Sequence, residues 1–332
     1  MKLSAFSVVD AFPSEEAAKR DRYSELLALG DAADAADLSA FWVAEHHFQP
    51  GGVLPSPPIA LAAVAARTRR LRLGAMVSVL PFHAPVEIAE QYALVDQLSH
   101  GRLNFGVGSG YLALELEAFG VPASDKRERF DAALATILRA WVGEPVRPAG
   151  PHGPEVALNV RPVQTPHPPL WIAVQRKEAI PFVARRGASL ALIPYATVSG
   201  LDELAEEIRL FRSAAPAGVK VEVAIGVHLY AGDHPARARA ALRQYLATRL
   251  ATQSTFYADK ARRDPAHATP EAIEKAGFAL FGRPAEVADR LSTFQSLGVD
   301  EVLGLFDFGG LPADDVRSSV AALGARWSAQ AG

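Results

Sequence analysis

The amino-acid sequence predicts an α/β fold, and more narrowly a (β/α)8 barrel formed as one domain by residues 1–332. Short apolar segments rich in β-branched and aromatic residues alternate with longer segments in which Ala, Leu and charged residues recur at helical spacing. Strand-helix alternation of this kind is typical of parallel βα units, and α/β barrels of this length commonly form one domain. We therefore expect a ligand site where the carboxyl ends of the strands meet.

The expected elements follow from this alternation. Strands are predicted at 3–9, 41–43, 71–80, 103–107, 170–174, 190–194, 219–230 and 302–305, and helices at 15–36, 57–68, 86–98, 127–142, 178–186, 201–214 and 312–327. Ser56 is a candidate N-cap before Pro57, and His100-Gly101 ends the third helix. The segment 143–168 is rich in proline and glycine, which predicts a surface excursion or hairpin.

One βα unit is much longer than the others. Between the seventh strand and Gly282, residues 231–281 have mixed helical and polar character. Long excursions at the loops of a barrel are usually functional. We expect this insertion to be a lid or a substrate wall that influences specificity.

Composition excludes several classes of function. The net charge is −3, and no basic cluster suggests nucleic acid or an anionic membrane as a partner. The chain has no cysteine, which excludes disulfides, a thiolate nucleophile and zinc sites that use sulfur. No apolar run reaches the ~18 residues of a membrane helix, and the N-terminus lacks the pattern of a signal peptide. We expect a cytoplasmic protein.

An ionisable cluster follows the second strand. The strand begins at Phe41-Trp42-Val43, and Glu45, His46 and His47 come just after it. Neighbours on a strand point to opposite faces, so one histidine should face the barrel mouth. Two structural or surface histidines are the alternative. A metal site would need a third ligand such as His83, and we expect none.

A glycine-rich segment follows the fourth strand. Glycines at 106, 108 and 110 flank Ser109, and such loops let backbone amides approach a phosphate. A tight turn is the alternative, because the pattern lacks the remainder of a dinucleotide fingerprint. Arg127, Arg129 and Arg176 can each neutralise phosphate or stay solvated, with Arg129 favoured as a solvated residue. A hydrolase would pair Glu45 with Glu115 or Asp307.

These motifs together resemble the bacterial luciferase-like flavin-dependent monooxygenases. The matching segments are 42–48 (WVAEHHF), 71–85 (LRLGAMVSVLPFHAP), 89–110 (AEQYALVDQLSHGRLNFGVGSG), 119–130, 169–187 (PLWIAVQRKEAIPFVARRG) and 282–288 (GRPAEVA). They span nearly the whole chain, and those of the first half are the most specific.

The resemblance implies a function. Members are (β/α)8 barrels that bind FMN, supplied in reduced form by a separate flavin reductase, and use O₂ to oxygenate a small organic substrate. It implies that His46 is the acid/base group beside the flavin peroxide and that Glu45 orients or tunes it. A non-proline cis peptide between Met76 and Val77 would support the flavin ring. The implied cofactor-binding residues are Phe6, Met76, Val77, Ser109, Gly110, Tyr111, Ala173, Gln175 and Arg176.

The phosphate site departs from the family pattern. The luciferase subunit has arginine at the position of Ser109, a carboxylate-serine pair at Gln175-Arg176, and a threonine and a serine at Ala179 and Pro194. Our hypothesis is that Arg176 replaces the missing arginine. A deazaflavin-dependent hydride-transfer enzyme and a non-catalytic flavin-binding protein remain the alternatives.

Two further expectations concern the dimer and the substrate. In the family, the helices predicted here at 57–68 and 86–98 pack across a homodimer interface, and the first is almost entirely apolar. Aromatic residues are expected in the substrate wall, although such residues also fill barrel cores. They are Phe82, Tyr111, Tyr195, His228, Phe306 and Phe308.

Overall fold

A closed parallel barrel forms the centre of the molecule. The computed structural model describes residues 1–11, 20–148, 153–252 and 269–331. The barrel strands are β1 (Lys2–Ser7), β2 (Ala40–Val43), β3 (Arg72–Ala75), β5 (Leu103–Gly108), β6 (Leu170–Ala173), β7 (Ser189–Leu192), β8 (Val223–Ala231) and β10 (Glu301–Asp307). They pair in chain order, and β10 closes the barrel by pairing with both β1 and β8. The structure therefore confirms the predicted (β/α)8 barrel.

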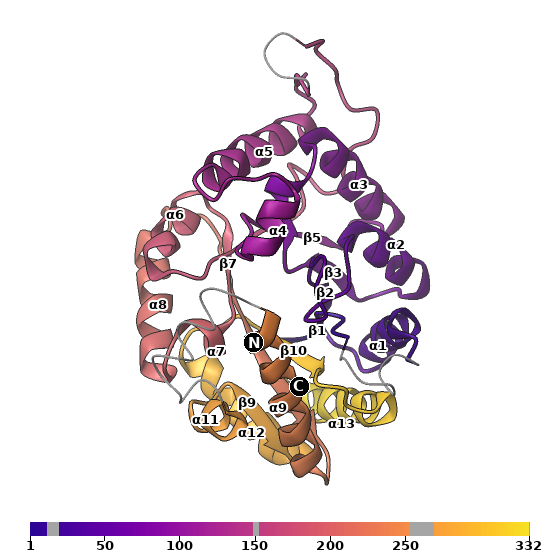
Figure 1. Cartoon of the computed structure of the whole chain (residues 1–332), viewed down its shortest axis with the longest axis vertical. Helices are drawn as coiled ribbons and strands as arrows, with labels where there is room; N and C mark the ends of the chain where they lie inside the picture. Colours follow the sequence, from indigo (N-terminus) through magenta and orange to yellow (C-terminus); the bar gives the residue numbers. More distant parts are fainter. Residues whose placement is uncertain (12–19, 149–152, 253–268, 332) are drawn as a thin grey trace.

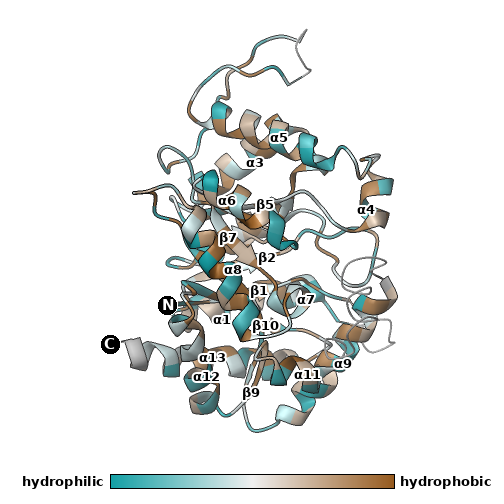
Figure 2. Ribbon diagram, turned by 90° about the vertical axis from the view of Figure 1, so that its left-hand side faces the viewer, coloured by the Kyte–Doolittle hydropathy of each residue, from teal (hydrophilic) through white to brown (hydrophobic). Residues whose placement is uncertain are grey.

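Helices surround the strands (Figure 1). They are α1 (Arg22–Ala35), α2 (Pro57–Arg67), α3 (Pro85–Leu98), α4 (Ala113–Ala118), α5 (Lys126–Trp141), α6 (Ile180–Arg185), α7 (Pro194–Thr197), α8 (Leu201–Ala214), α9 (Pro235–Thr252), α11 (Pro270–Lys275), α12 (Pro284–Ser296) and α13 (Ala313–Ala331). Their packing follows the helical period: α8 buries Leu204, Ile208 and Phe211 on one face. The helices accordingly alternate hydrophilic and hydrophobic residues around an apolar centre (Figure 2).

The structure corrects several predicted boundaries. The third strand is broken: β3 ends at Ala75, a non-proline cis peptide joins Met76 and Val77 as expected, and a short β4 (Ser78–Val79) follows. The first helix begins at Arg22, and residues 15–19 of the prediction lie outside the described residues. Ser56 occupies the N-cap position of α2 but its side chain makes no capping hydrogen bond. In the excursion 143–168, Val146 and Val156 form an antiparallel bridge.

The long insertion is more regular than expected. It contains α9, α11 and a further strand, β9 (Ala279–Gly282), which pairs in parallel with the carboxyl half of β8. Residues 253–268 of the predicted lid lie outside the described residues. The insertion therefore extends the sheet beyond the barrel as well as adding helices, and its role as a lid stays a prediction. Within the described residues, no helix combines the length and apolar character that spanning a bilayer requires.

Trp42 fills the barrel interior below the carboxyl edge. The indole is fully buried, lies edge-on to Trp171 with ring centroids 5.5 Å apart, and donates from Nε1 to Glu301 Oε1 at 2.8 Å. A Cβ atom on Gly74 would lie 2.2 Å from this indole, so only glycine leaves the space. The packed interior leaves the opening above it as the place for a ligand.

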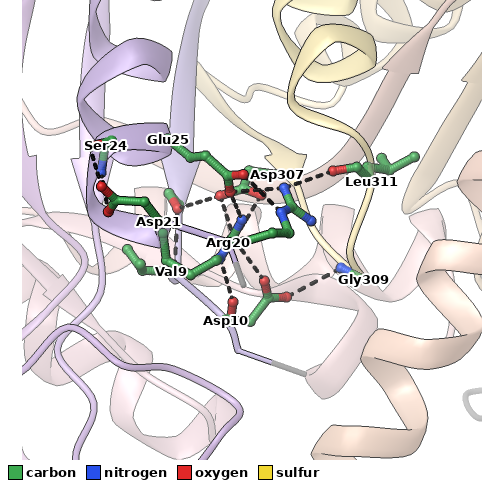
Figure 3. Close-up of polar contacts among 11 residues, drawn as sticks. Val9, Asp10, Arg20, Asp21, Ser24, Glu25, Asp307, Gly309 and Leu311 are labelled. Carbon is green, nitrogen blue, oxygen red and sulfur yellow. Dashed lines mark hydrogen bonds and ion pairs between the residues drawn. The ribbon is translucent and has the colours of Figure 1, made fainter. Parts of the chain in front are cut away.

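A buried ionic network joins the loop after β1, the start of α1 and the end of β10 (Figure 3). Arg22 donates to both carboxylate oxygens of Asp307, at 2.9 and 3.0 Å, and to Asp10 Oδ1 at 3.2 Å. Asp10 also accepts from the backbone N–H of Gly309 at 3.3 Å. Burial and the neighbouring Asp307 raise the pKa of Asp10 to about 7 despite the arginine. The network therefore holds together the carboxyl ends of β1 and β10, the pair of strands that closes the barrel.

Candidate active site

A cavity of about 1170 Å³ opens at the carboxyl ends of the strands. All the predicted site residues line it: the expected catalytic Glu45 and His46, and the expected cofactor-binding Phe6, Met76, Val77, Ser109, Gly110, Tyr111, Ala173, Gln175 and Arg176. Its volume exceeds the ~300–1,000 Å³ of most ligand sites. The cavity is therefore large enough for two ligands side by side.

His46 is held by a carboxylate from another βα unit. Its Nδ1 atom lies 3.1 Å from Glu115 Oε1, and Glu115 also accepts from the backbone N–H of His47 at 2.8 Å. Burial lowers the pKa of His46, so the imidazole is neutral at neutral pH. A carboxylate acceptor at Nδ1 places the proton there and leaves the Nε2 lone pair for a ligand in the cavity.

Glu45 has a different set of partners from the one we expected. Its carboxylate contacts Nε2 of His47 at 3.1 Å and Nε2 of His83 at 2.6 Å, and accepts from the backbone N–H of Val79 at 2.9 Å. We expected Glu45 to orient or tune His46, but Glu115, and not Glu45, contacts the ring, so the orienting part of that prediction is wrong. Glu45 acts on His46 only through its charge, as one of the smaller influences that raise its pKa.

Glu45, His47 and His83 form a cluster, in which Glu45 and His83 each shift the pKa of the other toward the charged form. Burial alone would raise the pKa of Glu45, but hydrogen bonds from His47 and His83 bring it below its ordinary value. Burial alone would lower the pKa of His83, but the hydrogen bond and charge of Glu45 raise it. Glu45 thus joins the end of β2 to β4 and the turn that carries His83.

Among the described residues, no group of three or more His, Cys, Asp or Glu side chains has an arrangement that could hold a metal ion.

Cations collect beside the glycine loop. Gly110 has a φ of +77°, and its carbonyl accepts from Nζ of Lys126 at 2.9 Å. Burial and the nearby charge of Arg176 lower the pKa of Lys126. Lys126 and Arg176 line the cavity together with Ser109. This side of the cavity is electropositive, and its glycine backbone leaves room for an anion to approach closely.

The other two candidate arginines contribute less. Arg127 reaches the cavity wall, but its Cζ atom stacks 3.2 Å from the ring centroid of Phe182 and its Nε donates to Asp131 at 3.3 Å. Arg129 is exposed and is not part of the wall. Arg176 is therefore the best placed of the three to meet a phosphate.

Aromatic residues and one arginine form a further part of the wall, which we call the inner chamber: Tyr111, Tyr195, Tyr245 and Arg249. Tyr245 and Arg249 come from α9, within the insertion. The hydroxyls of Tyr195 and Tyr245 lie 3.2 Å apart, and Arg249 Nη1 donates to the hydroxyl of Tyr111 at 3.4 Å. The chamber combines apolar ring faces with one guanidinium.

The expected substrate wall is only partly correct. Tyr111 and Tyr195 line the cavity, whereas Phe82, His228, Phe306 and Phe308 do not. Phe82 stacks on Phe119 with ring centroids 4.6 Å apart. His228, Phe306 and Phe308 are buried behind the inner chamber in the core. For His228, Phe306 and Phe308 the alternative of core packing is therefore correct, whereas Phe82 is half-buried against Phe119.

The wall residues that were not among the predicted site residues include Glu115, Lys126, Tyr245 and Arg249. The sequence offered a weak signal for some of them. Tyr245 and Arg249 are four residues apart, which puts them on one face of a helix. Lys126 directly precedes the candidate Arg127. Glu115 had been considered only as a hydrolase carboxylate, and nothing in its spacing relates it to His46.

Several sequence relatives are named as monooxygenases. The oxygenase component of flavin-dependent trigonelline monooxygenase from Acinetobacter baylyi is 26% identical over 316 residues, which cover 89% of this chain and 86% of that protein. The uncharacterized protein y4wF of Sinorhizobium fredii is 37% identical over 191 residues. That second match spans 57% of this chain and only 56% of the relative.

Solved structures share the whole fold. The monooxygenase RslO1 from Streptomyces bottropensis superposes with a TM-score of 0.80 at 25% identity, covering 100% of both chains. The oxygenating constituent of 3,6-diketocamphane monooxygenase from Pseudomonas putida, in complex with FMN, gives 0.79 at 18% identity over 98% of this chain and 96% of that one. The coenzyme F420-dependent tetrahydromethanopterin reductase from Methanopyrus kandleri gives 0.73 at 14% identity over 99% of both.

The family model described as luciferase-like monooxygenase matches residues 1–301. That range includes the barrel strands β1–β8, the histidine pair and the glycine loop. This chain belongs to the luciferase-like monooxygenase family.

Proposed function

We propose that this protein is an FMN-dependent monooxygenase that uses reduced flavin and O₂ to oxygenate a small organic substrate. The observation that carries the proposal is the position of His46 in the cavity. A buried, neutral imidazole, fixed by Glu115, stands in the wall of a cavity that has a cationic loop on one side and the inner chamber on another. This arrangement suits a flavin bound through its phosphate with a second ligand beside it.

The residues present fit FMN. Ser109, Gly110, Lys126 and Arg176 would hold the phosphate, because they supply cations and a left-handed glycine at one side of the cavity. The cis peptide at Met76-Val77 and the side chain of Phe6 line the same cavity, where they would support the ring. When bound and reduced, FMN supplies the electrons that activate O₂.

His46 would move protons beside the flavin. Its neutral form accepts a proton at Nε2 and returns it, while Glu115 keeps Nδ1 protonated and stabilises the imidazolium. The aromatic wall excludes water and so strengthens each of these interactions. Glu45 maintains the strand end from which His46 projects and takes no part in proton transfer.

The deciding experiment is an anaerobic titration with oxidised and photoreduced FMN, followed by addition of O₂. We expect tighter binding of reduced FMN, and a delay, relative to free FMN, before the spectrum of oxidised flavin returns. Binding of the deazaflavin F420 in place of FMN would select the hydride-transfer alternative. Binding of FMN with no effect on its reoxidation, and no turnover, would select the non-catalytic flavin-binding protein.

The phosphate site has its own test. Arg176→Ala should weaken FMN binding by about tenfold, because a charge-assisted contact is lost. Arg129→Ala, at an exposed arginine outside the cavity, is the matched control and should bind FMN as the wild type does. Equal affinities for the two variants would show that Arg176 does not replace the family's arginine.

The partners are also proposals. A separate reductase would supply reduced FMN, which the name of the Acinetobacter relative, an oxygenase component, supports. A homodimer would cover the apolar side chains exposed on α2 and α3, among them Ile59, Leu94 and Leu98, with 72%, 51% and 51% of their surface accessible. Light scattering at micromolar concentration tests the dimer. The expected cytoplasmic location stays a prediction.

A further inference from the structure

Arg249 has no use in the proposed flavin chemistry, yet it lies in the cavity wall. It is only 5% exposed, and its Nε atom has no hydrogen-bond partner in the described structure. Its Cζ atom lies 5.0 Å from the ring centroid of Tyr245, one turn earlier on α9. A buried guanidinium with an unused donor costs free energy unless a ligand completes it.

The groups around Arg249 do not neutralise its charge. Burial raises the pKa values of Tyr111, Tyr195 and Tyr245, so these phenols stay uncharged. Burial and the charge of Arg249 lower the pKa of His228 to about 3, which keeps that imidazole neutral. Among the described residues, Asp10 acts on Arg249 through its charge, and its own oxygen bonds to Arg22. Of the four residues that define the inner chamber, the guanidinium is therefore the charged group.

The chamber lies close to the proposed reaction centre. Tyr111 accepts a hydrogen bond from Arg249 at 3.4 Å, and its ring lies edge-on to His46 with centroids 6.2 Å apart. One tyrosine thus separates the guanidinium from the imidazole. A molecule anchored at Arg249 would extend past Tyr111 toward His46.

We infer that Arg249 binds the carboxylate of the organic substrate, and that the substrate is an organic acid with an apolar or planar body. The planar fork of a guanidinium matches a carboxylate, and the rings of Tyr195 and Tyr245 offer apolar faces for the body. The phosphate of a flavin has its own cations at Lys126 and Arg176. The inference deepens the proposed function, on which it rests for the identity of the reaction but not for the binding of the acid.

Calorimetric titration with two matched probes tests the inference. Benzoate and benzamide have the same ring and shape and differ in charge, and the pair is titrated into the protein without flavin and again with FMN. We expect benzoate to bind at least about tenfold tighter than benzamide. Arg249→Met, which keeps much of the side-chain length, should abolish this preference, and Arg249→Lys should retain part of it.

The control variant is Arg243→Met on the same helix, whose exposed guanidinium pairs with Glu271 outside the cavity. It should keep the wild-type preference for benzoate. Equal binding of the two probes by the wild type, or no binding of either, overturns the inference even if the Met variant does not fold. A loss of FMN affinity in Arg249→Met as large as the loss of benzoate affinity would also overturn it, because the guanidinium would then face the flavin.

The two proposals fail separately. Preference for benzoate in a protein that does not bind FMN would leave the acid site standing and refute the monooxygenase. FMN binding and delayed reoxidation without any preference for benzoate would leave the monooxygenase standing and refute the acid site.

Discussion

Glu45 and Glu115 are both buried carboxylates, with 3% and 1% of their surface exposed, and each contacts a histidine of the same segment. Their surroundings differ. Glu45 is shared among His47 of its own segment and three partners in the next barrel unit: His83, Ser78 and the backbone of Val79. Glu115 contacts His46 and the backbone of His47. The comparison teaches that sequence adjacency does not identify the partner of a catalytic residue.

The electrostatic consequences are opposite. Around Glu45, the pKa of the carboxylate falls and that of His83 rises, which favours an ion pair. At His46, burial lowers the pKa although Glu115 raises it, which favours the neutral ring. The ion pair of Glu45 and His83 is suited to stabilising the fold, whereas the neutral imidazole of His46 is suited to proton transfer.

The largest effect should follow loss of the imidazole in the cavity. His46→Asn should lower kcat/KM by about 10²–10⁴-fold, as expected for loss of a general acid/base, while FMN affinity stays within about threefold. Steady-state oxygenation and an FMN titration measure the two quantities. His47→Asn is the control, since His47 contacts Glu45 and is not part of the cavity wall. Equal losses in both variants would contradict the role of His46.

Loss of the Glu45 carboxylate should act on stability. Glu45→Ala leaves two histidines and a backbone N–H without their acceptor in the interior, so we expect the free energy of unfolding to fall by about 3–5 kcal/mol. Urea unfolding followed by circular dichroism measures it. The exposed pair Arg243–Glu271 gives the control, because Glu271→Ala should cost less than about 1 kcal/mol. Similar values for the two variants would show that the Glu45 cluster does not stabilise the fold.

Loss of the Glu115 charge should act on catalysis through His46. Glu115→Gln should lower kcat by about 10–100-fold, the usual range for a residue that orients a functional imidazole. Because Glu115 raises the pKa of His46, the variant should lower it further, and the acid limb of the kcat/KM profile should move to lower pH. In the wild type we expect this limb below the ordinary value of 6.5, because burial lowers the pKa of His46. A limb that moves to higher pH would contradict the assigned interaction.

The sequence predicts those parts of the site that short segments encode. The strand that ends in Glu45-His46-His47, the cis peptide at Met76-Val77 and the glycine loop before Tyr111 each lie within one βα unit. Local residue pattern and the resemblance to a family therefore predicted a site to which each of these segments contributes wall residues, although His47 itself is not part of the wall. Arg176 also follows a strand directly, so the barrel topology alone brings it to the same edge.

The rest depends on contacts between distant segments. Glu115 is 69 residues from His46, and no spacing rule relates them. Arg249 lies in a helix of the insertion, whose docking over the barrel no local pattern encodes. Strand β9 is four residues long, Ala279–Gly282, and a short apolar run does not distinguish a strand from a buried helix turn. These are the positions at which tertiary structure adds to the site.

The smallest expected effect is the pH dependence of the stability that His83 contributes through its contact with Glu45. The pKa of His83 is raised in the folded protein, so its contribution is fully present below 6.5, its ordinary value, and is lost as pH rises through the folded value. His83→Asn should therefore cost about 1 kcal/mol at the acid side of this window and progressively less above it. Unfolding free energies of the variant and the wild type, subtracted at each pH, isolate His83 from Asp10, which titrates nearby in both proteins. If the difference in unfolding free energy instead grew with pH, His83 would bind Glu45 as a neutral ring. The contrast between an ion pair at Glu45 and a neutral imidazole beside Glu115 would then not hold.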